Sequence, residues 1–543
     1  MGLFERDPGL PSKNPSRSAW LDENPLKNYK HSDSLPSYSD VVIIGSGFSG
    51  ASTSYHLLVD PRTRLSNIRR SADQPLSDGK LVTLLEAREA CSGATGRNGG
   101  HLIPANYRDF IADTEAFNSP MRVAAIRYME QIGALEVRNF IIENKIDCEF
   151  RFEGNLQVYS TQADFDHALK NLEAARSWGI GGQQVYTRQD LQNLFGPNEN
   201  FGGIKIPGGQ VFPAKLIWFM LFQAINAGLN LYTNTPVTKV ALATREERQN
   251  LPSNVQNGNL WCVTTESGEK IYTSKVVHAT NAYASHILPD YRTHIFPVRA
   301  QVLSPAAEYT NNRLFPFGLS LRHGLEYAIQ RDYPNGALIL GGRRTSSKSL
   351  EVDTADDSVV NPNLSRDLRE DFKKPEFSHL GLDPQNLYNV REWTGIMGFS
   401  DDTLPYVGEV VTRSGETLEG QYILAGFTGH GMPKCFRCGR EIARLIKESF
   451  MTPEEIRNIK YNSNQSVNPA SFEAIIERSQ IYNPTSAVNQ IDSSLWASIG
   501  TTNADTWDFP ILKVMHPTPD RMRTVNTSTW KNRDIIPDLQ SNL

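Results

Sequence analysis

Short apolar runs that lead into turns and helical patterns mark the first hundred residues of this chain. Val41 to Ile44 is a β-branched, fully apolar run, as a strand buried in a parallel sheet requires. From Phe48 to Val59, apolar and small side chains recur at helical spacing. A second apolar run, Lys80 to Leu85, ends at the acidic residue Glu86. The pattern predicts a strand, a tight turn, a helix and a second strand.

The turn between the first strand and the helix contains Gly45, Gly47 and Gly50 in the spacing GxGxxG. In a dinucleotide-binding unit the first glycine permits the tight turn and the second lets a pyrophosphate approach the backbone. The third allows the helix to pack closely on the strand. The free N–H groups of the helix start, at Phe48 and Ser49, would face the phosphates. A simple strand-to-helix turn can have the same glycines, so the motif alone leaves both interpretations open.

Glu86 favours the dinucleotide interpretation, because a ribose needs an acceptor for its hydroxyls at the end of the second strand. The acid lies further along the chain than the ~20 residues that the fingerprint expects. The polar segment 60–79 is about as long as the surplus, so we interpret it as an insertion. Together the strand, turn, helix, strand and terminal acid predict dinucleotide binding.

Bulk properties narrow the class of protein. A chain of 543 residues exceeds one simple core, so two or more domains are expected. The net charge of -5 gives no electrostatic case for a nucleic-acid partner. No apolar run approaches the ~20 residues of a membrane span, and the first forty residues lack an apolar signal core. The five scattered cysteines fit a reducing compartment.

The predicted location is therefore the cytoplasm. The chain ends in Ser541-Asn542-Leu543, which differs from the peroxisomal signal Ser-Lys-Leu by one residue. A peroxisomal address is thus an alternative with weak support, because the basic residue of the signal is missing.

A polar, glycine-rich segment directly after the second strand indicates which dinucleotide is bound. This segment, "EAREACSGATGRNGGHL" from Glu86 to Leu102, has no role in a simple nicotinamide-binding domain. It resembles the flavin-contacting loop of the D-amino-acid-oxidase-like FAD-dependent oxidoreductases. That family includes glycine oxidase, sarcosine oxidase and γ-glutamylputrescine oxidase, and the form Gly96-Arg-Asn-Gly-Gly100 is most similar to the last.

Further segments resemble the same family and follow in the order that it uses. They are "GGQVFPAKL", which opens a helix at Pro213, then "NTPVTKV", "VVHATNAYAS", "FPVRAQVL", "EYAIQRDYPNGALILGG", "REWTGIMGFSDDTLPYVGE" and "YILAGFTGHGM". The third departs from the family at Asn281, where glycine is usual. The resemblance spans roughly residues 38–450, and its specificity lies in the sequential order of the pieces.

The resemblance implies an α/β protein with a discontinuous Rossmann-like FAD-binding domain and an α+β substrate domain on a mixed, mainly antiparallel sheet. The FAD-binding parts are expected at 38–112, 204–291 and 386–450, and the substrate-domain parts at 113–203 and 292–385. An N-terminal arm (1–37) and a polar C-terminal extension (451–543) flank these domains. Three tryptophans of the extension favour a tail that wraps the body: Trp496, Trp507 and Trp530.

The resemblance also implies the cofactor, FAD. The stretch "REWTGIMGFSDDTLP" lacks the cysteine that sarcosine-oxidase-like members place nearby, so we expect non-covalent binding, with His101 or Cys91 as alternative attachment points. No metal site is predicted. The residues expected at the cofactor are Gly45, Gly47, Phe48, Ser49, Gly50, Glu86, Ala87, Thr95, Arg97, Asn98, Gly99, Gly100, Val237, Ala279, Thr280, Gly429, His430, Gly431 and Met432.

The last glycine-rich segment, "AGFTGHGMPKC", allows a flat ring to lie close to the backbone. Pro433 is expected to start a helix there, since its missing N–H costs nothing at the first position. The N-terminus of that helix would stabilise the anion of a reduced flavin. Cys435 and Cys438 within the helix are expected to be packed, inert thiols rather than a redox pair.

The implied activity is oxidation of a C–N bond of an amino acid or amine by hydride transfer to flavin N5. The imine product would be hydrolysed, and oxygen would reoxidise the flavin to give hydrogen peroxide. Two alternatives stay open: an FAD dehydrogenase that uses another acceptor, and a flavin-binding protein without turnover. The expected partners are a small-molecule substrate and oxygen, whereas substrate identity, stereochemistry and oligomeric state are not predicted.

Candidate catalytic residues follow from the need to hold a carboxylate and the flavin ring. Arg97 on the flavin loop is the first candidate for a carboxylate, because bidentate pairing suits it, and a phosphate contact or loop tether is the equal alternative. Arg299, Tyr327 and Arg343 lie on substrate-domain segments from which a side chain can reach the pocket. His430 is expected to donate an N–H to the flavin ring.

Overall fold

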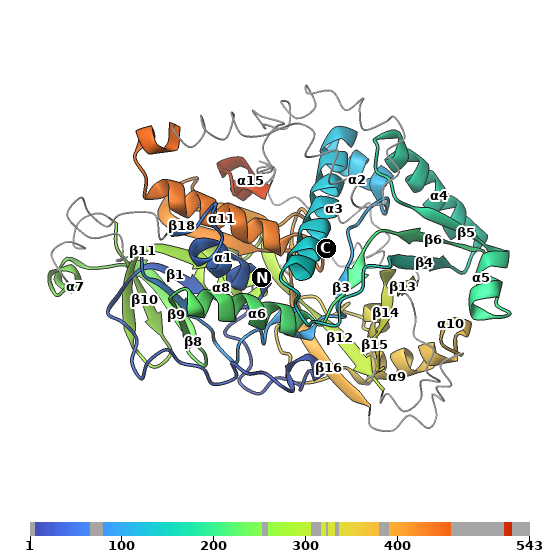
Figure 1. Cartoon of the computed structure of the whole chain (residues 1–543), viewed down its shortest axis with the longest axis horizontal. Coiled ribbons are helices and arrows are strands. Elements are labelled where there is room, and N and C mark those ends of the chain that lie inside the picture. The colour runs from blue at the N-terminus through green and yellow to red at the C-terminus, as the bar shows by residue number, and fades with distance from the viewer. Residues whose placement is uncertain are drawn as a thin grey trace.

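The computed structural model describes residues 6–65, 80–251, 259–305, 317–321, 324–331, 336–378, 390–457 and 515–523. Within these ranges the chain forms two eight-stranded sheets and one two-stranded sheet. Figure 1 shows the two large sheets toward opposite ends of the long axis. Three predictions concern residues outside the described ranges: the insertion beyond residue 65, the tryptophans Trp496, Trp507 and Trp530, and the C-terminal tripeptide Ser541-Asn542-Leu543.

The first sheet contains the predicted strand–turn–helix unit at its centre. Its strands are β1 (Tyr38–Ile44), β2 (Val82–Leu85), β8 (Leu229–Tyr232), β9 (Val237–Leu242), β10 (Trp261–Thr265), β11 (Lys270–His278), β17 (Tyr406–Val411) and β18 (Thr417–Ala425). The order is β17-β18-β11-β1-β2-β8, and β10 and β9 attach through β11. β1 pairs in parallel with β2 and β11, and it is buried from Ser39 onward. This confirms the buried parallel strand that the apolar run predicts.

Three helices cover one face of this sheet. They are α1 (Phe48–Leu58), α6 (Pro213–Asn226) and α11 (Cys435–Ser449), which lie side by side in Figure 1. α1 and α11 approach closely because their facing residues are small. A Cβ on Gly439 of α11 would lie 2.4 Å from Ser52 Oγ of α1, and that hydroxyl donates a hydrogen bond to Phe436 O (2.7 Å).

The starts of α6 and α11 differ in how well the sequence predicts them. Pro213 occupies the first turn of α6, as expected. Pro433 was expected to start α11, but the helix begins at Cys435. The reason is that residues 432–434 form a turn, which is joined to the helix when Cys435 N donates to Gly431 O (2.8 Å).

The second sheet is mixed and mainly antiparallel, as the resemblance implied. Its strands are β4 (Asn155–Tyr159), β5 (Gln184–Thr187), β6 (Gly202–Ile206), β12 (Ile295–Ser304), β13 (Gly318–Leu321), β14 (Glu326–Gln330), β15 (Leu338–Gly342) and β16 (Arg391–Ser400). The order is β16-β12-β15-β14-β13-β4-β6-β5, and every neighbouring pair is antiparallel except β13 and β4.

One strand of the segment 386–450 pairs with the second sheet. Residues 386–450 were assigned as a whole to FAD binding, yet β16 pairs with β12 from Arg391 to Ser400. The pairing buries all but the first two residues and Met397 of β16. The chain then enters β17 of the first sheet, so β16 connects the two sheets next to the cavity described below.

The remaining α-helices and a small sheet lie outside the two large sheets. They are α2 (Phe110–Phe117), α3 (Pro120–Glu143), α4 (Gln162–Ser177), α5 (Arg188–Phe195), α7 (Arg245–Gln249), α8 (Ala284–Ile287), α9 (Pro362–Glu370), α10 (Pro375–Ser378), α15 (Pro519–Arg523), and the small sheet of β3 (His101–Leu102) and β7 (Gly209–Gln210). Among the helices in the described ranges, none combines the length and apolar content needed to cross a membrane.

Both flanking segments pack on the body where they are described. In the N-terminal arm, Trp20 and Leu26 are each 1% exposed and belong to the main hydrophobic core. Near the C-terminus, Arg521 of α15 binds both carboxylate oxygens of Asp402 at 2.8 Å and stacks on the ring of Tyr406. The described parts of both segments therefore pack against the domains despite their polar composition.

Candidate functional site

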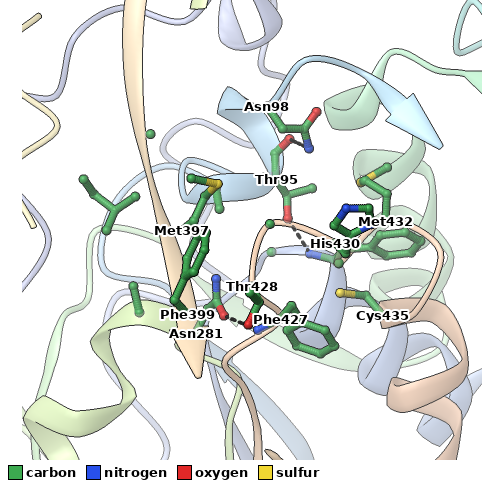
Figure 2. Close-up of a pocket in the computed structure, with 18 of the residues that line it drawn as sticks. Thr95, Asn98, Asn281, Met397, Phe399, Phe427, Thr428, His430, Met432 and Cys435 are labelled. Atoms are coloured by element: carbon green, nitrogen blue, oxygen red, sulfur yellow. Dashed lines mark hydrogen bonds between the residues drawn. The ribbon is translucent and has the colours of Figure 1, made fainter. Parts of the chain in front are cut away.

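A cavity of about 450 Å³ is lined by residues of both large sheets. This volume lies in the range of small-molecule sites. Most residues predicted at the cofactor line it, whereas Gly50 and Gly100 do not. Figure 2 shows Met397 and Phe399 of β16 on one side of the cavity and His430 and Met432 on the other.

The turn between β1 and α1 has the geometry that its three glycines predict. Gly45 adopts a φ of +103°, and a Cβ there would lie 2.6 Å from Ala279 O. A Cβ on Gly50 would lie 1.9 Å from Gly45 O, so only glycine allows the helix to start this close to the strand. Gly50 thus supports the site through backbone packing and does not line it.

Glu86 holds the turn through its carboxylate. Oε2 accepts hydrogen bonds from Ser46 N (2.9 Å) and Ser46 Oγ (2.6 Å), and Oε1 accepts one from Arg88 N (2.9 Å). A carboxylate has about four lone-pair positions, so Oε1 retains one for a ribose hydroxyl. Thr280 Oγ1 is buried in the same cavity wall without a hydrogen-bond partner among the described residues. Both groups fit a polar ligand at the ends of the parallel strands.

The loop after β2 is tied to α1 and shaped by its own polar side chains. Thr95 Oγ1 accepts a hydrogen bond from Phe48 N at 3.0 Å, drawn as a dashed line in Figure 2. Asn98 Oδ1 accepts from Gly100 N (2.7 Å), and Asn98 Nδ2 donates to Thr95 O (3.0 Å). These contacts place the loop backbone along the cavity beside the glycine turn.

Arg97 ties this loop to the rest of the protein. Its Nε donates to Ser92 O (2.8 Å), and its Nη1 donates to Ser16 O (2.6 Å) and Thr394 O (3.0 Å). Burial and the neighbouring Arg88 lower the pKa of Arg97 to about 10, so it is still charged at neutral pH. Of the roles that the sequence left open for Arg97, this geometry supports the loop tether and not the carboxylate ligand.

Two other candidate arginines point away from the cavity. Arg299 Nε binds Glu351 Oε2 at 2.6 Å, and Arg343 binds both oxygens of the buried Asp371. Neither arginine lines the cavity. Their ion pairs stabilise the second sheet. The structure therefore does not support the predicted contact of Arg299 or Arg343 with the substrate.

Sequence reasoning missed another arginine that lines the cavity, Arg344. Its guanidinium lies over the ring of Phe399, 5.3 Å from the centroid. Within the described residues it has no hydrogen bond or ion pair, and burial lowers its pKa. Arg343 adopts a left-handed φ of +60° just before it. That turn sends the two adjacent side chains to different surroundings, and the sequence shows no sign of it.

Tyr327 lies beside the flavin loop, as predicted for a pocket residue. A Cβ on Gly99 would meet its ring at 2.4 Å, and its ring contacts that of His101 edge to face at 5.3 Å. Burial raises the pKa of Tyr327 to about 12, so the phenol is a neutral donor at physiological pH. In the described part of the chain, the hydroxyl has no hydrogen-bond partner.

His430 lies on the loop between β18 and α11. Its Nε2 lies 3.3 Å from Arg108 Nη2, and because a guanidinium only donates, Nε2 accepts and Nδ1 carries the proton. Asn281 supports the same loop: it has a left-handed φ of +47°, and its Oδ1 accepts from Gly426 N (3.0 Å). The amide contact explains why asparagine serves where the family usually has glycine.

All five cysteines are buried and free of disulfides. Burial is the main cause that raises the pKa of each thiol, to about 12 for Cys148 and Cys435. Cys91 is 0% exposed and does not line the cavity, so it is a poor attachment point for a cofactor. The inert-thiol interpretation of Cys435 and Cys438 fits this burial.

We expect that none of the five thiols reacts within minutes with a disulfide reagent such as DTNB at pH 8. The buried thiols are protonated, and the reagent cannot reach them. After denaturation in guanidinium, all five should react. Absorbance at 412 nm counts the thiols in both states. Fast reaction of one or two in the native protein would contradict the burial, and a count of four after denaturation would reveal a covalent link at one cysteine.

Comparison with known proteins gives a consistent family assignment. The model of the family described as FAD dependent oxidoreductase matches residues 40–445. The probable oxidoreductase OrdL of Rhizobium meliloti (strain 1021) is 25% identical over 413 residues, which cover 75% of this chain and 82% of that protein. The gamma-glutamylputrescine oxidoreductase of Escherichia coli (strain K12) is 23% identical over 423 residues, 75% of this chain and 83% of its own.

A solved structure gives the same fold. The crystal structure of glycine oxidase from Geobacillus kaustophilus superposes with a TM-score of 0.56 at 20% identity, and covers 77% of this chain and 96% of the other. The glycine turn, the free lone pair of Glu86 and the unpartnered hydroxyl of Thr280 fit the dinucleotide that the family binds.

Proposed function

This chain belongs to the FAD dependent oxidoreductase family, and we propose that it oxidises a C–N bond of an amino acid or amine with oxygen as electron acceptor. FAD, when bound, supplies the hydride acceptor at its N5 position. Two of the similar proteins, gamma-glutamylputrescine oxidoreductase and glycine oxidase, carry amine-bearing substrates in their names. These names, together with the residues of the cavity wall, support an amino acid or amine as the substrate of this chain.

The proposal rests on one observation: a single cavity joins the glycine turn of β1–α1 to Arg344 and Tyr327 of the second sheet. Arg344 offers a planar fork of donors that matches a carboxylate, and Tyr327 offers a neutral hydroxyl. Neither side chain has a hydrogen-bond partner in the described residues, so a substrate carboxylate would satisfy them. Holding the carboxylate there orients the C–N bond of an amino acid toward the glycine turn.

The rest of the cavity wall has two further roles in the proposal. Ile396, Met397, Phe399 and Met432 supply apolar surface that excludes water. Low polarity lowers the pKa of a substrate amine, so it favours the neutral amine whose lone pair drives hydride departure. His430, with its proton on Nδ1, remains the proposed N–H donor to the cofactor ring.

The first test is the visible spectrum of the purified protein before and after acid precipitation. Flavin bands that move to the supernatant are expected, because the stretch 391–405 offers no cysteine for attachment. A panel of amino acids and amines is then tested for peroxide formation in air. One peroxide per substrate oxidised supports the oxidase. Anaerobic bleaching without peroxide in air would favour the dehydrogenase, and no bleaching by any substrate would favour a protein without turnover.

A further inference from the structure

The N-terminal arm runs across the cofactor cavity and is attached on both sides of it. Lys30 pairs with Tyr232 at the edge of the first sheet. The arm then passes the flavin loop and reaches the region of α8. Its residues Gly9, Leu10 and Pro11 are themselves part of the cavity wall. These arm residues can therefore contact a molecule that is bound in the cavity.

On the flavin-loop side, three arm residues bond to the loop backbone or its tether. Ser18 Oγ donates to Gly96 O (2.7 Å), and Trp20 Nε1 donates to Asn98 O (2.7 Å). Ser16 O accepts from the tether residue Arg97 (2.6 Å). Buried aromatic packing fixes this part, because the Trp20 ring meets the ring of Phe212 at 4.8 Å.

On the other side, the attachment is electrostatic and partly exposed. The Asp7 carboxylate binds His286 Nδ1 and Arg292 Nη2, both at 2.8 Å. Between the two attachments, Ser12 O accepts from Arg88 Nη1 at 3.3 Å. Arg88 and Glu86 line the same cavity as Gly9, Leu10 and Pro11. The contact of Arg88 with Ser12 therefore places this part of the arm near the end of the cavity where a ribose hydroxyl would meet Glu86.

We propose that the N-terminal arm is part of the FAD site: residues 9–12 cover the adenosine half, and Asp7 latches them to α8. Release of FAD then requires this segment to lift from the cavity. The inner attachment at Trp20 is buried and stays in place, whereas the outer one at Asp7 is 40% exposed on its side chain and opens first. The latch therefore sets how long FAD stays bound.

The test compares wild type, a chain lacking residues 1–13, and Asp7→Asn. Release of FAD is followed by the rise of flavin fluorescence after dilution, and apoprotein is titrated with FAD and with FMN, which lacks the adenosine half. Truncation should speed FAD release about tenfold and weaken FAD binding by a similar factor, while FMN binding changes less than about twofold. Asp7→Asn should speed release about threefold, since partly exposed ion pairs contribute modestly.

Glu23→Gln is the matched control, because Glu23 is an exposed carboxylate on the same arm without an ion pair in the described residues. It should release FAD at the wild-type rate. Unchanged release in Asp7→Asn together with unchanged release in the truncated chain would overturn the proposal, as would equal weakening of FAD and FMN. If the truncated chain fails to fold, Asp7→Asn decides alone. None of these readouts uses a substrate, so they stand apart from the proposed reaction.

Discussion

Gly50→Ala should weaken FAD binding on the order of 100-fold. The added Cβ would lie 1.9 Å from Gly45 O and 3.0 Å from Gly45 C, so the start of α1 must move away from the end of β1. The obstacle is backbone rather than a flexible side chain, which places the cost at the upper end of the 1–3 kcal/mol that overpacking typically costs. About 3 kcal/mol corresponds to FAD affinity weaker on the order of 100-fold. Titration of apoprotein with FAD measures the change.

The matched control for this prediction is Gly181→Ala. Gly181 has no positive φ, and the nearest atom to its added Cβ is Gly179 O at 3.9 Å. It lies in the loop after α4, away from the cavity. FAD affinity should stay at the wild-type value in this variant. Wild-type affinity in Gly50→Ala would show that the turn relaxes freely, and would contradict the role of the glycine.

The elements around the glycine turn could be predicted because their signals are local. The apolar run of β1, the GxGxxG spacing and the helical spacing after Phe48 all lie within about twenty residues. They favour a strand, a tight turn and a helix, and these three elements are compatible with one another in a single unit. Family resemblance added the order of distant strands, which no local pattern contains. The pairing of β16 with β12 was not predicted, because it depends on strands far apart in the chain.

The roles of the arginines could not be predicted, because each depends on partners distant in sequence. Arg97 is held by Ser16 and Thr394, which lie 81 and 297 residues away. Arg343 forms an ion pair with Asp371, whereas Arg344, the next residue, has no ion pair among the described residues and lies over the ring of Phe399. The sequence shows only that Arg97, Arg343 and Arg344 lie on or beside segments that resemble the family. Which of them lacks a carboxylate partner is a property of the folded cavity.

The N-terminal arm shows a different limit of sequence reasoning. Its composition is polar and rich in proline, which is typical of a disordered segment. Yet Trp20 is 1% exposed and bonds to the flavin loop. The burial of Trp20 and Leu26 and the hydroxyl contacts of Ser16 and Ser18 pack the arm on the domains, and composition alone does not reveal these contacts.

Arg344→Lys and Arg343→Lys make the same substitution at adjacent positions. The first should lower kcat/KM for an amino acid substrate, and the second should lower the melting temperature. If Arg344 holds the substrate carboxylate, Arg344→Lys keeps the charge but loses the bidentate fork, and kcat/KM for an amino acid substrate falls about tenfold. Arg344→Met also removes the charge. Loss of a buried charge partner costs about 2–5 kcal/mol, so kcat/KM falls by a factor between about 30 and about 5,000. Initial rates of peroxide formation measure both.

The deciding comparison uses the amine that lacks only the carboxylate of the best amino acid substrate. Its kcat/KM should change less than about threefold in Arg344→Met, so the preference for the acid collapses. Arg343→Lys should keep that preference and lower the melting temperature instead, because it weakens the buried pair with Asp371. Equal losses for acid and amine in Arg344→Met would mean that Arg344 shapes the cavity without binding the carboxylate. Another residue of the cavity wall would then have to bind the carboxylate, and Arg108, which lines the cavity beside His430, is one candidate.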